Sequence, residues 1–280
     1  MRATGEKEAC NDRVFHGICP ELRDGGHTRN GTPVRVQLLG NHLDAMAANA
    51  KRAIELGSHG IDINFGCPSK TVNRHRGGAV LLKEPETLYQ IVSAVRAAVP
   101  RPTVVSAKMR LGFDDTSLML DNAAAIEAAG ADELTVHART RLQGYAPPAH
   151  WHEVGRIRQH IRIPLIANGD ICSVEDYHRC VELAGTRDVM LGRGAVKLPM
   201  LAKLIRGNQA VGSSWAQVGP LVHGFWQETS TVLTPNDCIG RLKQWMNYLR
   251  QQHPEAELLW QAIRAERKVV DIGALLAGAC

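Results

Sequence analysis

The chain has 280 residues, 44% of them hydrophobic, with a formal net charge of +5 at neutral pH and a pI near 8.9. A chain of this size and composition can bury a sizeable core in one large domain, or in one large and one small domain. Its longest apolar runs fall far short of the roughly 20 residues that a membrane-spanning helix needs. The N-terminal residues show neither an apolar signal-peptide core nor transit-peptide character, so we expect a cytoplasmic protein without a membrane segment.

The seven cysteines are scattered along the chain without a C-x-x-C pair. That spacing does not suit a zinc site, and the odd number favours reduced thiols over a disulfide framework. We therefore expect no metal. The excess of basic residues suits a polyanionic partner, but many unrelated proteins share this balance, so the location of the charges must decide.

From residue 34 onward, short runs rich in β-branched residues alternate with amphipathic helical stretches such as 43–56 and 86–99. The six predicted strands are 34–39, 61–65, 104–110, 133–139, 164–168 and 188–192. This alternation is typical of an α/β fold with a parallel sheet, and the repeat length indicates a TIM barrel of the (βα)8 type, which takes about 250 residues. The pattern therefore lacks the first two barrel strands.

The remaining segments set the expected domain boundaries. Residues 1–33 are rich in Gly, Asp, Arg and Asn with one brief apolar stretch at Val14 and Phe15, so they resemble a loop or an altered N-terminal segment. The six βα units fill residues 34–206. Beyond residue 213 the pattern is helical without further strand-and-turn alternation, which predicts a C-terminal all-α domain over 213–280.

Strand alternation separates polar from apolar side chains in four of the predicted strands. In 105–111, for example, Ser106, Lys108 and Arg110 face away from the apolar set. The helix-facing side of a barrel is apolar, so the polar set should point to the axis and, near strand ends, to the C-terminal mouth where barrel active sites lie. Six strands would each bring one polar group there: Gln37, Asn64, Lys108, His137, Asn168 and Arg193. Any single member could be a solvated strand-end residue, but the whole set is hard to explain in that way.

The last two predicted strands end in glycine-containing turns at 168–170 and 192–194, each followed by a helix. Glycines there allow a close backbone approach and expose N–H groups, and barrels commonly bind phosphate after strands seven and eight. Arg193 adds a fixed positive charge. Since no G-x-G-x-x-G motif lies in a βαβ unit, a mononucleotide cofactor fits better than a dinucleotide in a Rossmann domain.

Two further residues at the mouth suggest redox chemistry. Lys108 would place a cation near a flavin ring, whose reduced form carries negative charge, although a strand-end lysine can also simply reach solvent. Cys67 directly follows a predicted strand, between Gly66 and Pro68. A cysteine is more often a small buried hydrophobe than a catalyst, and the position at the mouth is what favours the catalytic interpretation here.

Five motifs together resemble the tRNA-dihydrouridine synthases. They are NFGCPSK (64–70), KMRLG (108–112), HART (137–140), NGD (168–170) and GRG (192–194). The match runs from about Val14 to the C-terminus in the order and spacing of the family. The segment RLKQWMNYLR (241–250) is similar to the helical-domain motif of the C subgroup, which acts on uridine 16 of the tRNA D-loop.

The resemblance implies reduction of uridine to 5,6-dihydrouridine with FMN as resident cofactor and NADPH (or NADH) as transient reductant. In this reaction hydride goes to C6, and Cys67 gives a proton to C5. We expect the enzyme to be a monomer. The implied flavin contacts are Gln37, Lys108, His137, Asn168, Gly169, Asp170, Gly192 and Arg193. The implied contacts to the tRNA substrate are Asn64, Tyr145, Arg139, Arg241, Lys243 and Arg250. A D-loop nucleotide is cheaper to extrude from its stack than a paired one.

The sequence departs from the family at its beginning. The family starts with a strand carrying a Pro-Met segment, then a helix and a second strand, and none of these is recognisable before Val14. A barrel opened in this way leaves unpaired strand edges and an exposed interior. Two alternatives therefore stay open, namely an inactive remnant with residual tRNA binding and a flavin barrel that reduces a small molecule, similar to dihydroorotate dehydrogenase. The basic helical C-terminal segment argues against the second.

Overall fold

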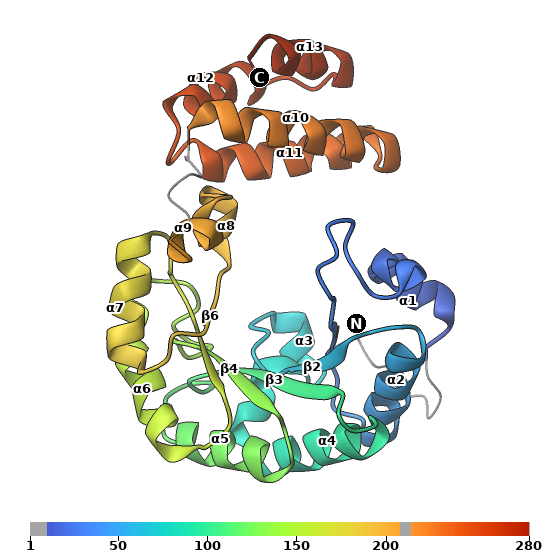
Figure 1. The fold of residues 1–280 in the computed structure, drawn as a ribbon, viewed down its shortest axis with the longest axis vertical. Coiled ribbons are helices and arrows are strands. Elements are labelled where there is room, and N and C mark those ends of the chain that lie inside the picture. The colour runs from blue at the N-terminus through green and yellow to red at the C-terminus, as the bar shows by residue number, and fades with distance from the viewer. Residues whose placement is uncertain (1–9, 208–213, 280) are drawn as a thin grey trace. The chain divides into compact units, whose positions relative to one another are not determined.

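The structure is a computed structural model that describes residues 10–207 and 214–279. Its contacts divide the chain into two compact units (Figure 1). The first comprises the chain up to Gly169 together with Cys180–Met190, and the second comprises Asp170–Arg179 and Leu191–Cys280. The expected start of the helical domain at residue 213 and the first residues of the expected segment 1–33 lie outside the described residues. The boundaries 34–206 and 213–280 remain predictions.

The first unit is built on a six-stranded parallel sheet whose strands lie side by side in chain order. The strands are β1 (Val36–Leu38), β2 (Gly60–Asn64), β3 (Val104–Arg110), β4 (Glu133–His137), β5 (Leu165–Asn168) and β6 (Val189–Met190). All six predicted strands are confirmed, as is the α/β fold class. Among the described residues before β1 there is no strand.

Helices connect consecutive strands. They are α2 (Leu43–Glu55), α3 (Lys70–Arg74), η2 (Gly78–Lys83), α4 (Pro85–Ala98), α5 (Met119–Ala128), α6 (Trp151–His160) and α7 (Val174–Ala184). Of these, α2, α4, α5 and α6 cover the outer face of the curved sheet (Figure 1). The apolar set of β3, Val105, Ala107 and Met109, is fully buried. Burial of such side chains supplies the main stabilisation of a sheet covered by helices.

The segment before β1 differs from our expectation of a loop. It forms helix α1 (Asp12–Ile18) and a short 3-10 helix, η1 (Pro20–Asp24). The side chain of Asn11 caps the N-terminus of α1, Phe15 is only 1% exposed, and Arg52 of α2 donates two hydrogen bonds to Asp12, at 2.7 and 2.6 Å. Of the brief apolar stretch, Phe15 is thus buried on a short helix, whereas the neighbouring Val14 stays exposed.

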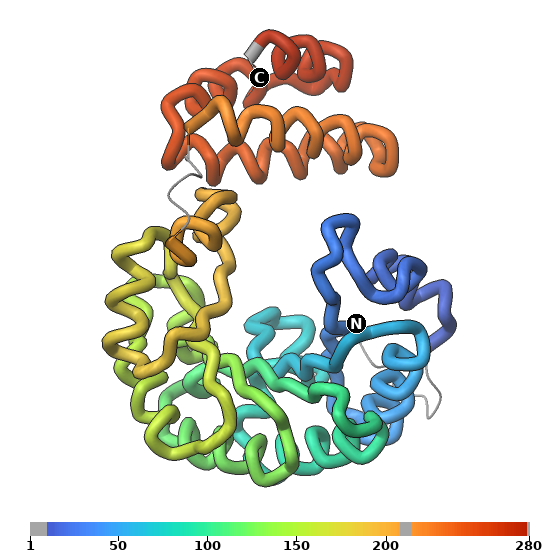
Figure 2. The backbone as a smooth tube through the Cα atoms, in the orientation of Figure 1, coloured from blue at the N-terminus to red at the C-terminus, as the bar shows by residue number. Residues whose placement is uncertain are grey.

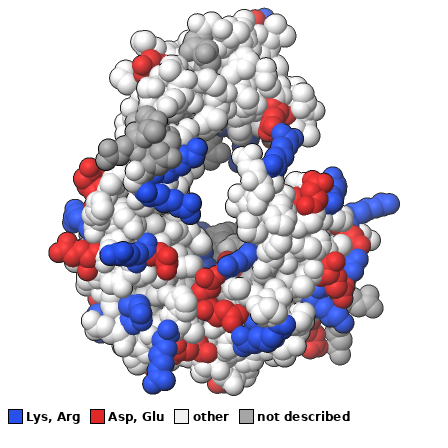
Figure 3. Space-filling model, viewed as in Figure 1, with Lys and Arg blue, Asp and Glu red and all other residues white. Residues whose placement is uncertain are grey.

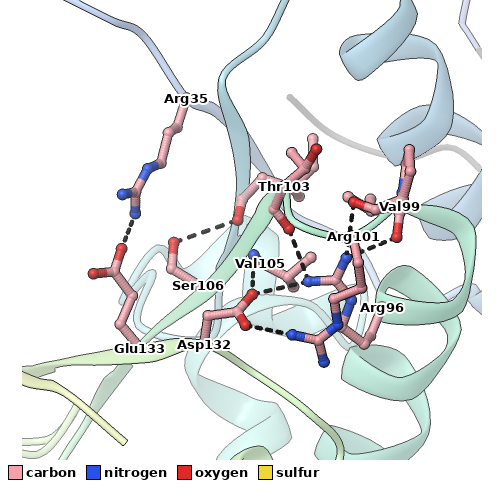
Figure 4. Close-up of polar contacts among 11 residues, drawn as sticks. Arg35, Arg96, Val99, Arg101, Thr103, Val105, Ser106, Asp132 and Glu133 are labelled. Carbon is pink, nitrogen blue, oxygen red and sulfur yellow. Dashed lines mark hydrogen bonds and ion pairs between the residues drawn. The ribbon is translucent and has the colours of Figure 1, made fainter.

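The amino ends of the strands carry matched opposite charges (Figure 4). One oxygen of Asp132 accepts from Arg96 and the other from Arg101, both at 2.8 Å, and the backbone N–H of Val105 donates to the same carboxylate. Arg35 forms an ion pair with Glu133. Each of these carboxylates therefore faces a guanidinium group, as suits an end of the sheet that contributes to stability.

The second unit is helical, which confirms the predicted all-α segment (Figure 2). Its helices are α8 (Arg193–Lys197), α9 (Leu201–Ile205), α10 (Trp215–Val232), α11 (Pro235–Leu249), α12 (Pro254–Ile263) and α13 (Val269–Ala279). Leu242, Met246 and Leu249 of α11 lie in its core beside Trp226 and Ile272. None of the described helices in either unit is long and apolar enough to cross a membrane.

Candidate active site

The parallel register places the polar residues of neighbouring strands side by side at the carboxyl end of the sheet. Asn64 is paired with Lys108, Arg110 with His137, and His137 with Asn168. Since the ends of parallel strands meet at one edge, this register brings together most of the polar set predicted from strand alternation. Gln37, Asn64, Lys108, His137 and Asn168 all lie within the first unit.

A network of side-chain hydrogen bonds links β1, β2 and β3. The carboxylate of Asp62 accepts from Gln37 Nε2 at 2.5 Å and from Ser106 Oγ at 2.8 Å. Asn64 Nδ2 donates to Gln37 Oε1 at 2.7 Å, and Asn64 Oδ1 accepts from the backbone N–H of Gly66 at 2.9 Å. Gln37 and Asn64, predicted to contact flavin and substrate, thus also form a connected framework.

Lys108 is partly buried beside this network. Burial lowers the pKa of its ammonium group, the charge of Arg110 lowers it further, and the charge of Asp62 raises it. A partly buried cation of this kind would be stabilised by an anionic group bound next to it. The position and electrostatics of Lys108 therefore suit a cofactor that becomes negatively charged.

Cys67 lies on a loop whose backbone is held at several points. Its carbonyl oxygen accepts from Asn73 Nδ2 at 2.9 Å and from the backbone N–H of Ala79 at 3.1 Å. Gly78 has a φ of 68°, and a Cβ there would lie 2.9 Å from the Cβ of Cys67, so only glycine fits this approach. Residue Cys67 is half-buried.

Arg110 connects the loops after β2 and β4. Its side chain, 2% exposed, donates from Nε to the carbonyl of Gly66 at 2.9 Å and from Nη1 to the carbonyls of Thr140 and Gly144, at 3.1 and 2.9 Å. Its guanidinium carbon lies 5.2 Å from the centre of the Tyr145 ring. Arg110 thereby fixes the Cys67 loop relative to the loop that carries Tyr145.

His137 and Tyr145 form the aromatic part of the site. Their ring centres are 5.9 Å apart, and Tyr145 is 55% exposed whereas His137 is buried. Gly169 has a φ of 125°, and a Cβ there would lie 3.0 Å from the His137 ring, while its carbonyl accepts from Trp151 Nε1 at 2.9 Å. Asn168 Nδ2 donates to the carbonyl of Met190 at 2.7 Å and so joins β5 to β6.

The remaining predicted flavin residues, Asp170, Gly192 and Arg193, belong to the second unit. Arg193 Nη2 donates to Asp170 Oδ1 at 2.8 Å, so the positive charge that we expected to be available for phosphate has an acidic partner. No atom lies within 4 Å of a Cβ built on Gly192, which leaves room for a ligand to approach its backbone.

The structure reassigns one of the basic residues predicted to contact tRNA. Arg139 is completely buried, and its Nε donates to the carbonyl of Pro148 at 3.2 Å. A side chain without exposed surface cannot contact a phosphate directly, so the direct contact expected for Arg139 is not supported, and its geometry is that of a positioning residue.

The other three basic candidates lie on α11. Lys243 Nζ donates to the carbonyls of Arg264 and Glu266 at 3.0 and 2.5 Å, and Arg250 pairs with Glu257 at 2.9 Å. Arg241 is exposed and makes only a 3.4 Å contact to Gln244 Oε1 among the hydrogen bonds resolved for it. Arg241 therefore has the greatest freedom of the three to meet a phosphate.

A groove of about 510 Å³ opens beside Arg241 in the second unit. It is lined by Ala195, Val196, Pro199, Phe225, Arg241, Gln244, Trp245 and Tyr248. Trp245 is partly buried, donates from Nε1 to the carbonyl of Val196 at 3.0 Å, and meets the Phe225 ring edge-on at 5.0 Å. On the face shown in Figure 3, Lys and Arg of the sheet-containing unit are interspersed with Asp and Glu and form no single basic patch.

Sequence reasoning missed two residues of this site, Asp62 and Arg110. Both were visible on the polar faces of their strands, but neither was assigned a role. The signal that could have found them is the same alternation that found Lys108. Among the described residues, no group of three or more His, Cys, Asp or Glu side chains could hold a metal ion.

Comparison with known proteins defines the class of protein. A family model described as "Dihydrouridine synthase (Dus)" matches residues 7–230. The chain belongs to the dihydrouridine synthase family, a family of oxidoreductases, which confirms the resemblance carried by the five motifs.

The relatives show which members of the family the chain is similar to. The tRNA-dihydrouridine(16) synthase of Shewanella oneidensis is 48% identical over 261 residues, which are 93% of this chain and 82% of that protein. The protein of the same name from Pseudomonas syringae pv. tomato is 47% identical over 94% of this chain and 84% of its own length. That of Ralstonia nicotianae is 49% identical over 90% and 78%. These names agree with the C-subgroup motif at 241–250.

Proposed function

We propose that the chain reduces uridine 16 in the D-loop of tRNA to 5,6-dihydrouridine, with FMN as bound cofactor and NADPH as reductant. The single observation that carries the proposal is the half-buried thiol of Cys67 on a fixed loop at the carboxyl end of the sheet, next to Arg110 and the strand of Lys108. Membership of the family and the names of the relatives support the same reaction.

The residues at this edge fit a flavin. Lys108 offers a cation whose charged form an anionic neighbour would favour, and Gln37, His137, Asn168 and Gly169 lie on the adjoining strands or directly after them. In the second unit, the open space at Gly192 suits the approach of a phosphate group to the backbone. When bound, FMN would supply the hydride that reduces C6 of the base, after itself being reduced by NADPH.

The chain's own residues would hold the base and supply the proton. Cys67 Sγ would donate its proton to C5, and it needs a fixed position because general acid catalysis requires the donor within hydrogen-bonding reach. Arg110 holds the loop of the donor against the loop of Tyr145. The exposed ring of Tyr145 would stack on the extruded base, since unstacked bases in RNA are commonly held by aromatic side chains.

The helical unit would contact the tRNA backbone. Arg241 is exposed, and Lys243 and Arg250 lie on the same helix, α11. Phosphate contacts of this kind position a nucleic acid and make its binding dependent on salt. We assign the direct contact first to Arg241, because the contacts of Lys243 and Arg250 engage their charged groups within the bundle.

The test is to incubate the purified chain with FMN, NADPH and a tRNA that lacks dihydrouridine, and to map the product by mass spectrometry. We expect a gain of two hydrogen atoms at uridine 16 and a visible flavin spectrum of the protein. A colourless chain that binds tRNA without changing it would identify a non-catalytic remnant. A flavin-containing chain with neither product nor salt-dependent tRNA binding would point to a reductase of small molecules.

A further inference from the structure

The hydrogen-bond network around Asp62 has a fixed assignment of donors and acceptors. An ionised carboxylate can only accept hydrogen bonds, so Gln37 must present its NH2 group to Asp62 and its carbonyl oxygen to Asn64. Asn64 must then present its own NH2 group to Gln37, which leaves its oxygen to accept from the backbone of Gly66. One carboxylate thus selects the orientation of two side-chain amides.

The groups around Asp62 offset the effect of its burial in part. The pKa of Asp62 is raised, chiefly by burial, while the hydrogen bonds from Gln37 and Ser106 and the charges of Lys108 and Arg35 lower it. In turn, the charge of Asp62 raises the pKa of Lys108, against the effect of burial and of Arg110. Asp62 and Lys108 therefore favour each other's charged forms.

The network ends at the loop of the proposed proton donor. Gly66 precedes Cys67 directly, and its N–H and carbonyl groups are both engaged, by Asn64 Oδ1 and by Arg110 Nε. We propose that Asp62 is a positioning residue for this loop: its carboxylate fixes the amides of Gln37 and Asn64 and through them the backbone beside Cys67. In this proposal Asp62 acts through Gln37 and Asn64 and not by contact with the substrate. The importance of Asp62 for catalysis rests on the proposed function. The effect of Asp62 on the position of the Cys67 loop can be tested without that function.

The experiment measures how fast iodoacetamide alkylates Cys67 in the full chain without flavin or tRNA, with the modified peptide quantified by mass spectrometry well below the melting temperature. Asp62→Val removes the acceptor but suits a strand, and we expect alkylation about threefold to tenfold faster as the loop loosens, the size of one lost hydrogen bond. Asp62→Asn should return to within about twofold of the parent rate. Its oxygen can still accept from Gln37 while Ser106 Oγ accepts from its NH2 group.

A double-mutant cycle separates positioning from a general loss of stability. If Asp62 acts through Asn64, adding Asp62→Val to Asn64→Ala should change the Cys67 rate by less than about twofold. Asp132→Val is the matched control, because Asp132 also accepts several hydrogen bonds but lies at the opposite end of the strands. It should lower the melting temperature and leave the Cys67 rate within about twofold.

Three results would overturn the proposal. The first is a Cys67 alkylation rate in Asp62→Val equal to that of the parent. The second is a double variant, Asp62→Val with Asn64→Ala, whose alkylation rate rises by the product of the two single effects. The third is an Asp62→Asn variant that is alkylated as fast as Asp62→Val. If Asp62→Val does not fold, Gln37→Leu cuts the network at its next link, and the same cycle with Asn64→Ala applies. Failure of the proposed reaction would show as absence of dihydrouridine in tRNA treated with the parent chain. The alkylation rates of Cys67 could still be measured, because they need neither flavin nor tRNA.

Discussion

The two ends of the parallel sheet are both polar, but they handle their charges differently. At the amino end, Asp132 faces Arg96 and Arg101, and Glu133 faces Arg35. At the carboxyl end, Arg110 directs its hydrogen bonds to backbone carbonyls, and Lys108 is partly buried with Asp62 as its nearby acidic group. An end with matched charges contributes to folding, whereas an end with an excess of positive charge and a half-buried thiol can bind an anionic ligand and react. Substitutions at the two ends should therefore separate stability from activity.

The largest expected effect is on activity, at Cys67. Cys67→Ala should lower kcat for dihydrouridine formation by about 10²–10⁴-fold, the usual contribution of a general acid, because no other proton donor occupies this position on the loop. The flavin spectrum and the melting temperature should stay close to those of the parent, since the side chain is only half-buried. Cys172→Ala, which alters another half-buried thiol, is the control and should remain active. Undiminished turnover of Cys67→Ala would remove Cys67 from the mechanism.

The next largest effect is expected at Arg110, where a substitution should lower both stability and activity. Arg110→Met keeps the length of the side chain but leaves the carbonyls of Gly66, Thr140 and Gly144 without their donor. Unmet hydrogen bonds of this kind should lower the free energy of unfolding by about 2–4 kcal/mol, and the loosened loop should lower kcat/KM as well. Thermal melting and steady-state kinetics measure the two losses. Arg110→Lys keeps the charge and should recover part of each; an Arg110→Met protein as stable as the parent would show that these contacts matter little.

At the amino end of the sheet, we expect a substitution to lower stability and to leave activity unchanged. Asp132→Ala removes the carboxylate shared by Arg96, Arg101 and the backbone of Val105, and we expect the free energy of unfolding to fall by about 1–3 kcal/mol. Turnover per folded molecule, measured well below the melting temperature, should stay within about twofold of the parent because the site lies at the other end of the strands. A large loss of turnover in the stable temperature range would break the proposed division between the two ends.

The same contrast shows what sequence could predict. Alternation with a period of two located Lys108, His137 and Asn168 correctly on their strands, because that periodicity is a local property of the backbone. It did not predict that Phe15 is buried on a helix, because the burial of a side chain depends on tertiary packing and not on local periodicity. The hydrogen-bond partners of Lys243 could not be predicted either. The sequence does not show whether a lysine binds tRNA or donates to backbone carbonyls, here those of Arg264 and Glu266.

The smallest expected effect is the change in the free energy of unfolding caused by substituting Glu133. It tests whether the ion pairs at the amino end of the sheet act independently. The ion pair of Glu133 with Arg35 is partly solvent-exposed, with 19% and 40% of the two side chains accessible, so Glu133→Gln should change the free energy of unfolding by at most about 1 kcal/mol, and less at high salt. A loss as large as that of Asp132→Ala would show that the amino end acts as one cooperative network. Arg35 also lowers the pKa of Asp62, so releasing Arg35 from Glu133 should favour the ionised form of Asp62 slightly. Cys67 alkylation should consequently be unchanged in Glu133→Gln, and any change would reveal electrostatic coupling between the two ends of the sheet.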